Sequence, residues 1–343
     1  MIKFEKRSLK TEIRNPLLNF AIDKQEIELR KDPLTGMFCR ININRSKRVH
    51  PGLAEPDSVK QVIEKSKPKC PFCSVNIFKV TPKFVGMKER FILGNSVIVP
   101  NLYPFGTFHG VAVLSPKHHY LKLDEISPKL LYESLENIID FFKVANKKKP
   151  RFKYHSINFN YMPPAAASII HPHFQIILDD KPTRMTDLLI KKSSEYFKRA
   201  KSNFWSDLVK TEKKKKERFI GETGNFSWLA DFAPIRNNQV SGVCKGISNF
   251  SQMKTSQIRD LANGLSKIFK RLWDNKVRTL NLTIYSGPAD KDISDYFLLN
   301  LKLISRPVLA QYYVSDIGFM EYMHQEPVVE TLPENVAKSL RLG

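Results

Sequence analysis

Two segments of this 343-residue chain share one order of elements. Residues 155–178 read HSINFNYMPPAAASIIHPHFQIIL and residues 280–304 read LNLTIYSGPADKDISDYFLLNLKLI, and each is a strand-like run, a loop with proline and another strand-like run. A recurring order predicts an internal repeat. Strands mixed with long helices predict an α+β fold with a largely antiparallel sheet. We therefore expect two tandem domains, at residues 1–184 and 185–343.

The spacing of apolar residues predicts the individual elements. In the first domain, strands are expected at 37–43, 90–100, 109–114, 154–160 and 171–178, with helices at 58–66 and 123–148. In the second domain, strands are expected at 218–232, 279–286 and 296–305, with a helix at 255–275. The lysine-rich helical segment 185–218 between the domains is interpreted as a connector.

Composition limits the class of protein. Apolar residues make up 42% of the chain, which is enough for a sizeable core. No run of about 18 apolar residues occurs, so no transmembrane helix is expected. The N-terminus lacks the apolar stretch of a signal peptide, which predicts a cytoplasmic protein. Four cysteines in a cytoplasmic chain of this length do not indicate a disulfide framework.

The chain is strongly basic, with 56 Lys and Arg against 34 Asp and Glu, a formal charge of +22. Such a charge is typical of proteins that bind nucleic acid, membrane surfaces or small anions. Lysine runs such as 213–216 are interpreted as solvated, because no aromatic residues are interleaved with them to stack on bases. We therefore expect the charge to serve an anionic small molecule, with a nucleic-acid-binding protein as the distant alternative.

The segment Ser168-Ile-Ile-His-Pro-His-Phe-Gln175 combines two imidazoles with an amide. If 171–178 is a strand, His171, His173 and Gln175 share one face, because side chains alternate along a strand. Phe174 and Ile176 then point into the core. Polar side chains in such a row are unfavourable to bury without partners, and the row is therefore a candidate functional site.

Cys70 and Cys73 form a C-x-x-C pair, the usual first half of a zinc site, because two thiolates at this spacing can bind one tetrahedral ion. No second such pair exists, so the other ligands must be histidine or carboxylate. The candidate histidines are His109, His118, His119, His155, His171 and His173. A redox pair and a metal-free buried pair are the alternatives.

Taken together, these motifs resemble the galactose-1-phosphate uridylyltransferase branch of the histidine triad (HIT) superfamily. The matching pieces are Arg30-Lys-Asp-Pro-Leu-Thr-Gly36, Asn44-Arg-Ser-Lys-Arg48, Cys70-Pro-Phe-Cys73, Asn101-Leu-Tyr-Pro104, Ser115-Pro-Lys-His118, Asn160 and Ser168 to Gln175. The second half of the chain matches only by pattern. The resemblance implies two HIT-like domains, a homodimer and a role in carbohydrate metabolism, galactose metabolism included.

The resemblance also implies residue roles. Zinc would be bound by Cys70, Cys73, His118 and His171, with His119 as the alternative to His118 and iron as the alternative to zinc. His173 would be the nucleophile, and Gln175 would bind phosphate oxygens. Ser168 and Asn160 would reach the phosphates or the imidazole, Arg45 and Arg48 would face the diphosphate, and Asn101 would lie along the nucleotide. Asn300 and Lys302 stand where His173 and Gln175 stand in the first copy, so the second copy would lack a nucleophile.

These roles describe nucleotidyl transfer in two displacements through a covalent nucleotidyl-histidine. The implied reaction moves a nucleoside monophosphate from a nucleotide-sugar to a sugar 1-phosphate, as a UDP-glucose–hexose-1-phosphate uridylyltransferase does. In the alternative, AMP moves from an ADP-sugar, adenylyl sulfate or a dinucleotide to inorganic phosphate. Residues 316–323 differ from the family in charge and bulk, which leaves the sugar and the base open. Since His324 is the one histidine in the family's region of a second metal site, no such site is expected.

Overall fold

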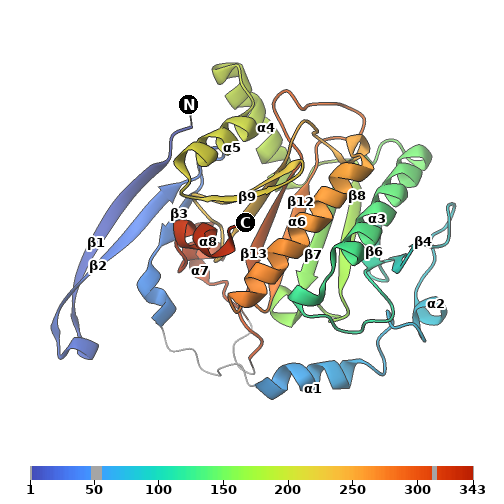
Figure 1. Ribbon diagram of the computed structural model, residues 1–343, viewed down its shortest axis with the longest axis horizontal. Coiled ribbons are helices and arrows are strands. Elements are labelled where there is room, and N and C mark those ends of the chain that lie inside the picture. The colour runs from blue at the N-terminus through green and yellow to red at the C-terminus, as the bar shows by residue number, and fades with distance from the viewer. Residues whose placement is uncertain (1, 48–55, 311–314, 343) are drawn as a thin grey trace.

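The computed structural model describes residues 2–47, 56–310 and 315–342. Its centre is a ten-stranded antiparallel sheet in the order β4-β5-β6-β8-β7-β12-β13-β11-β10-β9 (Figure 1). The strands are β4 (Phe91–Leu93), β5 (Ser96–Pro100), β6 (Phe108–Val113), β7 (Tyr154–Tyr161), β8 (His173–Asp179), β9 (Phe219–Thr223), β10 (Phe226–Ala230), β11 (Val240–Cys244), β12 (Leu280–Tyr285) and β13 (Asn300–Ser305). The expected α+β class with a largely antiparallel sheet is confirmed.

The large sheet consists of two halves with the same internal order. From its outer edge inward, the first half runs β4-β5-β6-β8-β7, and the second runs β9-β10-β11-β13-β12. The halves meet where β7 pairs antiparallel with β12, from Tyr161 opposite Leu280 to Ser156 opposite Tyr285. Helix α3 (Pro128–Lys148) lies between β6 and β7 in the chain, and α6 (Thr255–Asp274) lies between β11 and β12. The sequence repeat is therefore a structural one, while the boundary at residue 184 stays a prediction.

One hydrogen-bond arrangement recurs in both halves. Glu133, the sixth residue of α3, accepts from the backbone and side-chain nitrogens of Asn95. Asp260, the sixth residue of α6, accepts from the same two nitrogens of Asn225. Each asparagine follows a glycine of positive φ, Gly94 or Gly224, in a tight turn. These turns divide the expected strands 90–100 and 218–232 into the hairpins β4–β5 and β9–β10.

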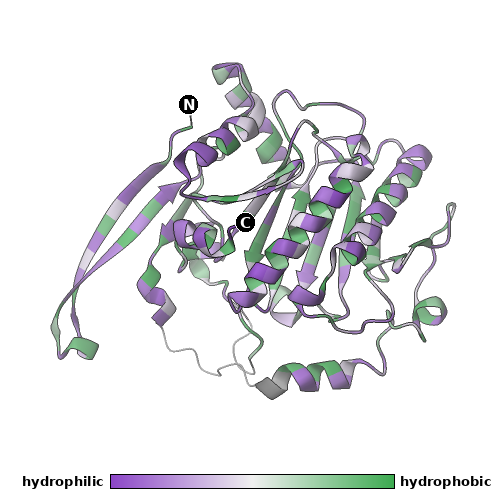
Figure 2. Ribbon diagram, viewed as in Figure 1, coloured by the Kyte–Doolittle hydropathy of each residue, from purple (hydrophilic) through white to green (hydrophobic). Residues whose placement is uncertain are grey.

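The main core lies between the large sheet and the two helices. Along β7 every second residue is buried, and Ile157 and Phe159 point toward α3 and α6. Figure 2 shows hydrophilic residues on the outer surfaces of these helices and hydrophobic segments in the strands behind them. Ser127 caps α3 by accepting a hydrogen bond from the backbone of Leu130. The opposite face of the sheet carries polar side chains, Asn158 and Asn160 among them.

The segment expected as a connector forms two packed helices, α4 (Arg184–Ala200) and α5 (Phe204–Lys215). Leu189, Phe204 and Trp205 form a second core with Phe297 and neighbouring residues. The interpretation of 185–218 as a connector is therefore wrong: its lysines lie on the outside, but its apolar residues cover the second half of the sheet. Lys214 to Lys216 are exposed at the end of α5, as a solvated run would be.

A smaller sheet in the order β1-β2-β3-β14 was not expected in full from the sequence. Its strands are β1 (Glu5–Asn15), β2 (Ala21–Lys31), β3 (Phe38–Ile41) and β14 (Val328–Val329). The β1–β2 hairpin projects from the rest of the molecule (Figure 1). At the base of this hairpin, Arg30 is 1% exposed and forms an ion pair with Glu334. Glu334 also forms an ion pair with Arg218.

The remaining helices are short. They are α1 (Pro56–Ser66), α2 (Ile77–Val80), α7 (Phe319–Tyr322) and α8 (Pro333–Leu340), with a 3-10 turn η2 (Ile43–Lys47) after β3 and another, η4 (Pro163–Ala165), after β7. Among the residues that the structure describes, no helix has both the length and the apolar character of a membrane span.

Candidate active site and metal centre

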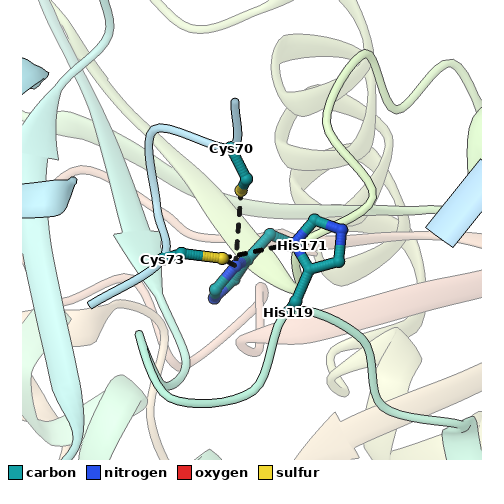
Figure 3. A group of neighbouring side chains, drawn as sticks. All are labelled: Cys70, Cys73, His119 and His171. Atoms are coloured by element: carbon teal, nitrogen blue, oxygen red, sulfur yellow. Dashed lines mark hydrogen bonds between the residues drawn. The ribbon is translucent and has the colours of Figure 1, made fainter. Parts of the chain in front are cut away.

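Two cysteines and two histidines come together beside the first half of the sheet (Figure 3). Cys70 and Cys73 lie in the loop between α1 and α2, His119 lies in the loop after β6, and His171 lies two residues before the first residue of β8. Their ligand atoms all lie within 4.8 Å of one another. His171 Nδ1 is 3.6 Å from Cys70 Sγ and 3.7 Å from Cys73 Sγ, and His119 Nδ1 is 3.4 Å from Cys73 Sγ.

The donor set suits a tetrahedral metal ion such as zinc. Burial and the adjacent Cys70 sulfur raise the pKa of the Cys73 thiol to about 11, so a cation is needed to stabilise thiolates near neutral pH. Burial lowers the pKa of His171 to about 4, which keeps its imidazole neutral, as a ligand must be. Each histidine also has a second partner: His171 Nε2 donates to the Ser115 carbonyl at 2.9 Å, and His119 Nε2 lies 2.9 Å from Ser66 Oγ.

The structure replaces His118 with His119 in this group. The His118 backbone donates to the Ser115 carbonyl in the turn that follows β6, and the His118 side chain is exposed with Nδ1 2.9 Å from Ser115 Oγ. His119, one residue later in the turn, is only 5% exposed and points toward the cysteines. The turn therefore decides which of two adjacent histidines joins the candidate group, and it brings in His119, the alternative, in place of His118.

His173 is the first residue of β8, whereas the expected strand began at His171. Its Nδ1 donates to the His171 carbonyl at 2.7 Å, which leaves the lone pair on Nε2. Burial lowers the pKa of His173, so the imidazole is neutral near pH 7. The Phe72 ring, from the cysteine loop, packs edge-on against it with centroids 5.2 Å apart. A neutral imidazole held in this way can act as a nucleophile through Nε2.

Gln175 and Asn101 meet at His109, which the sequence indicates only as a possible metal ligand. His109 Nε2 lies 3.0 Å from Gln175 Oε1 and 3.2 Å from Asn101 Nδ2. Phe105 packs on the His109 ring, with centroids 4.2 Å apart. His109 stands on β6, two residues before Val111, which pairs with Gln175. The sequence could have indicated that His109 faces Gln175, because side chains two residues apart on a strand point to the same face.

The remaining expected site residues lie on other elements. Asn160 is on β7, and its Oδ1 accepts from Asn281 of β12 at 2.8 Å. Ser168 is exposed in the loop between η4 and β8. Arg45 is half-buried on η2. Arg48 lies outside the described residues.

The second half has a different set of groups at the matching positions. Asn300 donates through Nδ2 to the Leu298 carbonyl, two residues back, as His173 does to His171. Lys302, in the place of Gln175, forms a 3.0 Å ion pair with Asp231. This register supports the expected correspondence of Asn300 with His173. An amide and a paired lysine offer no nucleophile there.

Known proteins resemble this chain over nearly its whole length. No family model matches it. An uncharacterized protein from Archaeoglobus fulgidus is 28% identical over 96% of both chains. The ADP-glucose phosphorylase of Arabidopsis thaliana is 24% identical over 94% of both chains.

Solved structures were compared as well. The crystal structure of an ADP-glucose phosphorylase from Arabidopsis thaliana with bound ADP-glucose superimposes with a TM-score of 0.73, at 20% identity, over 92% of this chain and 99% of that one. A uridylyltransferase structure gives a TM-score of 0.67 at 18% identity, over 91% of this chain and 97% of that one. The chain has the fold of the galactose-1-phosphate uridylyltransferase-like branch of the HIT superfamily. The expected resemblance to this branch is thus confirmed at the level of the fold.

Proposed function

We propose that this uridylyltransferase-like protein is a nucleotidyltransferase whose covalent nucleophile is His173. The observation that carries the proposal is the hydrogen bond from His173 Nδ1 to the His171 carbonyl, which fixes the tautomer with a free lone pair on Nε2. The same His171 contacts both cysteines through its side chain. The proposed nucleophile therefore bonds to the backbone of a residue whose side chain belongs to the candidate metal centre.

The reaction would proceed in two displacements. His173 Nε2 attacks the α-phosphorus of a nucleotide-sugar, the bond to the bridging oxygen breaks, and the sugar 1-phosphate leaves with that electron pair. A phosphate oxygen of the acceptor then attacks the same phosphorus, and the P–N bond breaks to restore neutral His173. Gln175, Ser168 and Asn160 would donate hydrogen bonds to the phosphate oxygens, and Arg45 and Arg48 would balance their charge. Asn101 would lie along the nucleotide.

Cys70, Cys73, His119 and His171 would hold the metal, for which zinc fits the donor set best. With four protein ligands it would be structural, fixing the start of β8. The protein's own residues would then carry the chemistry.

Two donor classes are supported by different observations. The similarity to an ADP-glucose phosphorylase over 94% of both chains favours transfer of AMP from an ADP-sugar to inorganic phosphate. The likeness to a uridylyltransferase structure and the motifs of the first domain favour transfer of UMP between hexose phosphates. We infer a nucleotide-sugar donor in either case, with a cytoplasmic homodimer as the working form.

The deciding experiment is intact-protein mass spectrometry after separate incubation with UDP-glucose and ADP-glucose. An acid-labile gain of one UMP or one AMP, absent in His173→Ala, is expected, and it would also name the base. No adduct with either donor, in folded protein with bound metal, would contradict the proposal. Tight, salt-sensitive binding of polynucleotide without any adduct would favour the nucleic-acid alternative instead.

A further inference from the structure

His109 has no part in the two displacements, yet it lies in the middle of the candidate active site. It is 3% exposed and stands on β6. Its strand neighbours Val111 and Val113 pair with Gln175 and His173. Because side chains two residues apart on a strand share a face, His109 lies on the same face of the sheet as the proposed nucleophile.

The direction of the hydrogen bond to Gln175 follows from its acceptor. Gln175 Oε1 can only accept, so His109 Nε2, 3.0 Å away, carries the proton. The other ring nitrogen, Nδ1, is buried and has no hydrogen-bond partner among the described residues. With Oε1 occupied, the amide of Gln175 turns its NH₂ group away from His109. A phosphate oxygen can only accept, so this NH₂ group is the end of the amide that it needs.

Asn101, beside the same histidine, is oriented by its own turn. Its Oδ1 accepts the backbone N–H of Tyr103 at 2.8 Å, so its Nδ2 faces His109 Nε2 at 3.2 Å. A protonated Nε2 cannot accept, and both hydrogens of Asn101 Nδ2 therefore stay available to a ligand. His109 Nε2 thus bonds to Gln175 alone, while the backbone N–H of Tyr103 sets the direction of the Asn101 amide.

We propose that His109 is a positioning residue that holds Gln175 with its NH₂ group toward the α-phosphate of the donor. This inference rests on the proposed function, and it assigns to His109 a role that the proposed function leaves open. In the second half, Gln239 stands where His109 stands in the first, and its different contacts support the proposal by contrast. There Gln239 bonds to Asp231, and Asp231 pairs with Lys302, so the corresponding groups bind one another.

A role in packing alone is the competing explanation, and the chain offers a matched control for it. His155 is also 3% exposed, and its Nε2 bonds to a side-chain amide oxygen, that of Asn146. It stacks on Phe142 at 4.5 Å, as His109 packs on Phe105. However, His155 contacts the helix α3, on the other face of the sheet. Replacing it tests the loss of a buried histidine without touching the candidate site.

The experiment measures the single-turnover rate constant of adduct formation, with whichever of ADP-glucose and UDP-glucose labels the wild type. His109→Phe keeps a ring but removes the donor, and we expect it to slow adduct formation about 10- to 100-fold. His109→Gln restores an N–H donor and should recover part of the rate. His155→Phe should lower the melting temperature by a similar amount while leaving the rate within about twofold.

A double-mutant cycle separates positioning from packing. Once Gln175→Ala has removed the amide, adding His109→Phe should slow the reaction by less than about twofold, because positioning acts only through Gln175. Independent multiplication of the two effects, or equal slowing by His155→Phe, would overturn the inference. A wild-type protein that forms no adduct would contradict the proposed function itself, whereas a wild-type adduct with an unaffected His109→Phe would contradict only the positioning role.

Discussion

His171 and His173 bond to the backbone through different ring nitrogens, and this difference defines what the other nitrogen of each can do. His173 is tied to a carbonyl through Nδ1, and His171 is tied to another through Nε2. The free nitrogen of His171 therefore faces the cysteine sulfurs, while that of His173 is left for chemistry. In the proposed function, the same kind of side chain would serve as a metal ligand at one position and as the nucleophile two residues later, because a different ring nitrogen bonds to the backbone.

The choice between the adjacent histidines 118 and 119 leads to a sharp prediction. His119→Ala should abolish most metal binding, because a tetrahedral site that loses one of four ligands holds its ion far more weakly. His118→Ala, its neighbour on the exposed side of the turn, should retain the metal at one ion per chain. Metal content by inductively coupled plasma mass spectrometry checks both. Loss of the metal in His118→Ala with retention in His119→Ala would refute the assignment.

At the scale of single elements, the two glycine-asparagine turns stand out. A Cβ at Gly94 would collide with the Glu133 carboxylate, and a Cβ at Gly224 would collide with the Asp260 carboxylate. Both residues also have positive φ, which disfavours any side chain. In each half, the turn therefore packs directly against the helix whose carboxylate accepts its hydrogen bonds.

We expect Gly94→Ala to lower the free energy of unfolding by about 2 to 3 kcal/mol, from backbone strain and a displaced carboxylate together. Gly86→Ala is the matched control, because Gly86 also has positive φ but a Cβ there would meet no atom within 4 Å. The Gly86→Ala variant should be destabilised by about 1 kcal/mol, because it has the backbone strain without the collision. Urea denaturation measures both. Equal losses in the two variants would show that the carboxylate contact adds nothing.

A group of charges joins Arg30 of β2, Arg218 just before β9 and Glu334 of α8. Burial raises the pKa of Glu334, but hydrogen bonds from Arg30 and Arg218 outweigh it and lower that pKa to about 2. A depressed carboxyl pKa stabilises the fold above the unfolded value, near 4.5, and this stabilisation is lost as the pH falls toward 2.

Glu334→Gln should therefore lower the free energy of unfolding by about 3 kcal/mol at pH 7, because it leaves two buried guanidinium groups with less compensation. The difference from the wild type should shrink as the pH falls from about 4.5 toward 2. Thermal unfolding at a series of pH values tests this. A difference that stays constant across that range would mean that the charge of Glu334 contributes nothing.

At the scale of the whole molecule, the two halves share one sheet. The β7–β12 pair is central, and α3 packs against α6 across it. Separating the halves would leave β7 and β12 as open edges beside exposed apolar surface.

We expect the chain to unfold in one cooperative transition, and the fragment 1–184 to be unfolded or aggregated when it is expressed alone. Co-expression with 185–343 should recover soluble, paired fragments. Circular dichroism and size-exclusion chromatography check this. A fragment 1–184 that folds alone and keeps its metal would show that the halves are independent domains.

The sequence alone determined the features that depend on local chemistry. Alternating apolar residues predicted the central strands, and helical spacing predicted α3 and α6. The C-x-x-C and His-Pro-His motifs predicted a metal centre beside a nucleophile through the family resemblance that they carry. The repeat was visible because both copies preserve the same order of elements. These signals are short-range, and the physical rules that connect them to structure act over a few residues.

Only the tertiary structure decided which groups meet. His119 replaces His118 because the path of one turn determines which side chain faces the cysteines, and neighbouring positions in a sequence carry no such information. His109 joins the site because β6 pairs with β8, whose residues are more than 60 positions away. The segment 185–218 packs as part of the fold because its apolar residues find partners on distant strands. Long-range pairing, which depends on the whole chain, therefore assembled the site from pieces that the sequence had already indicated.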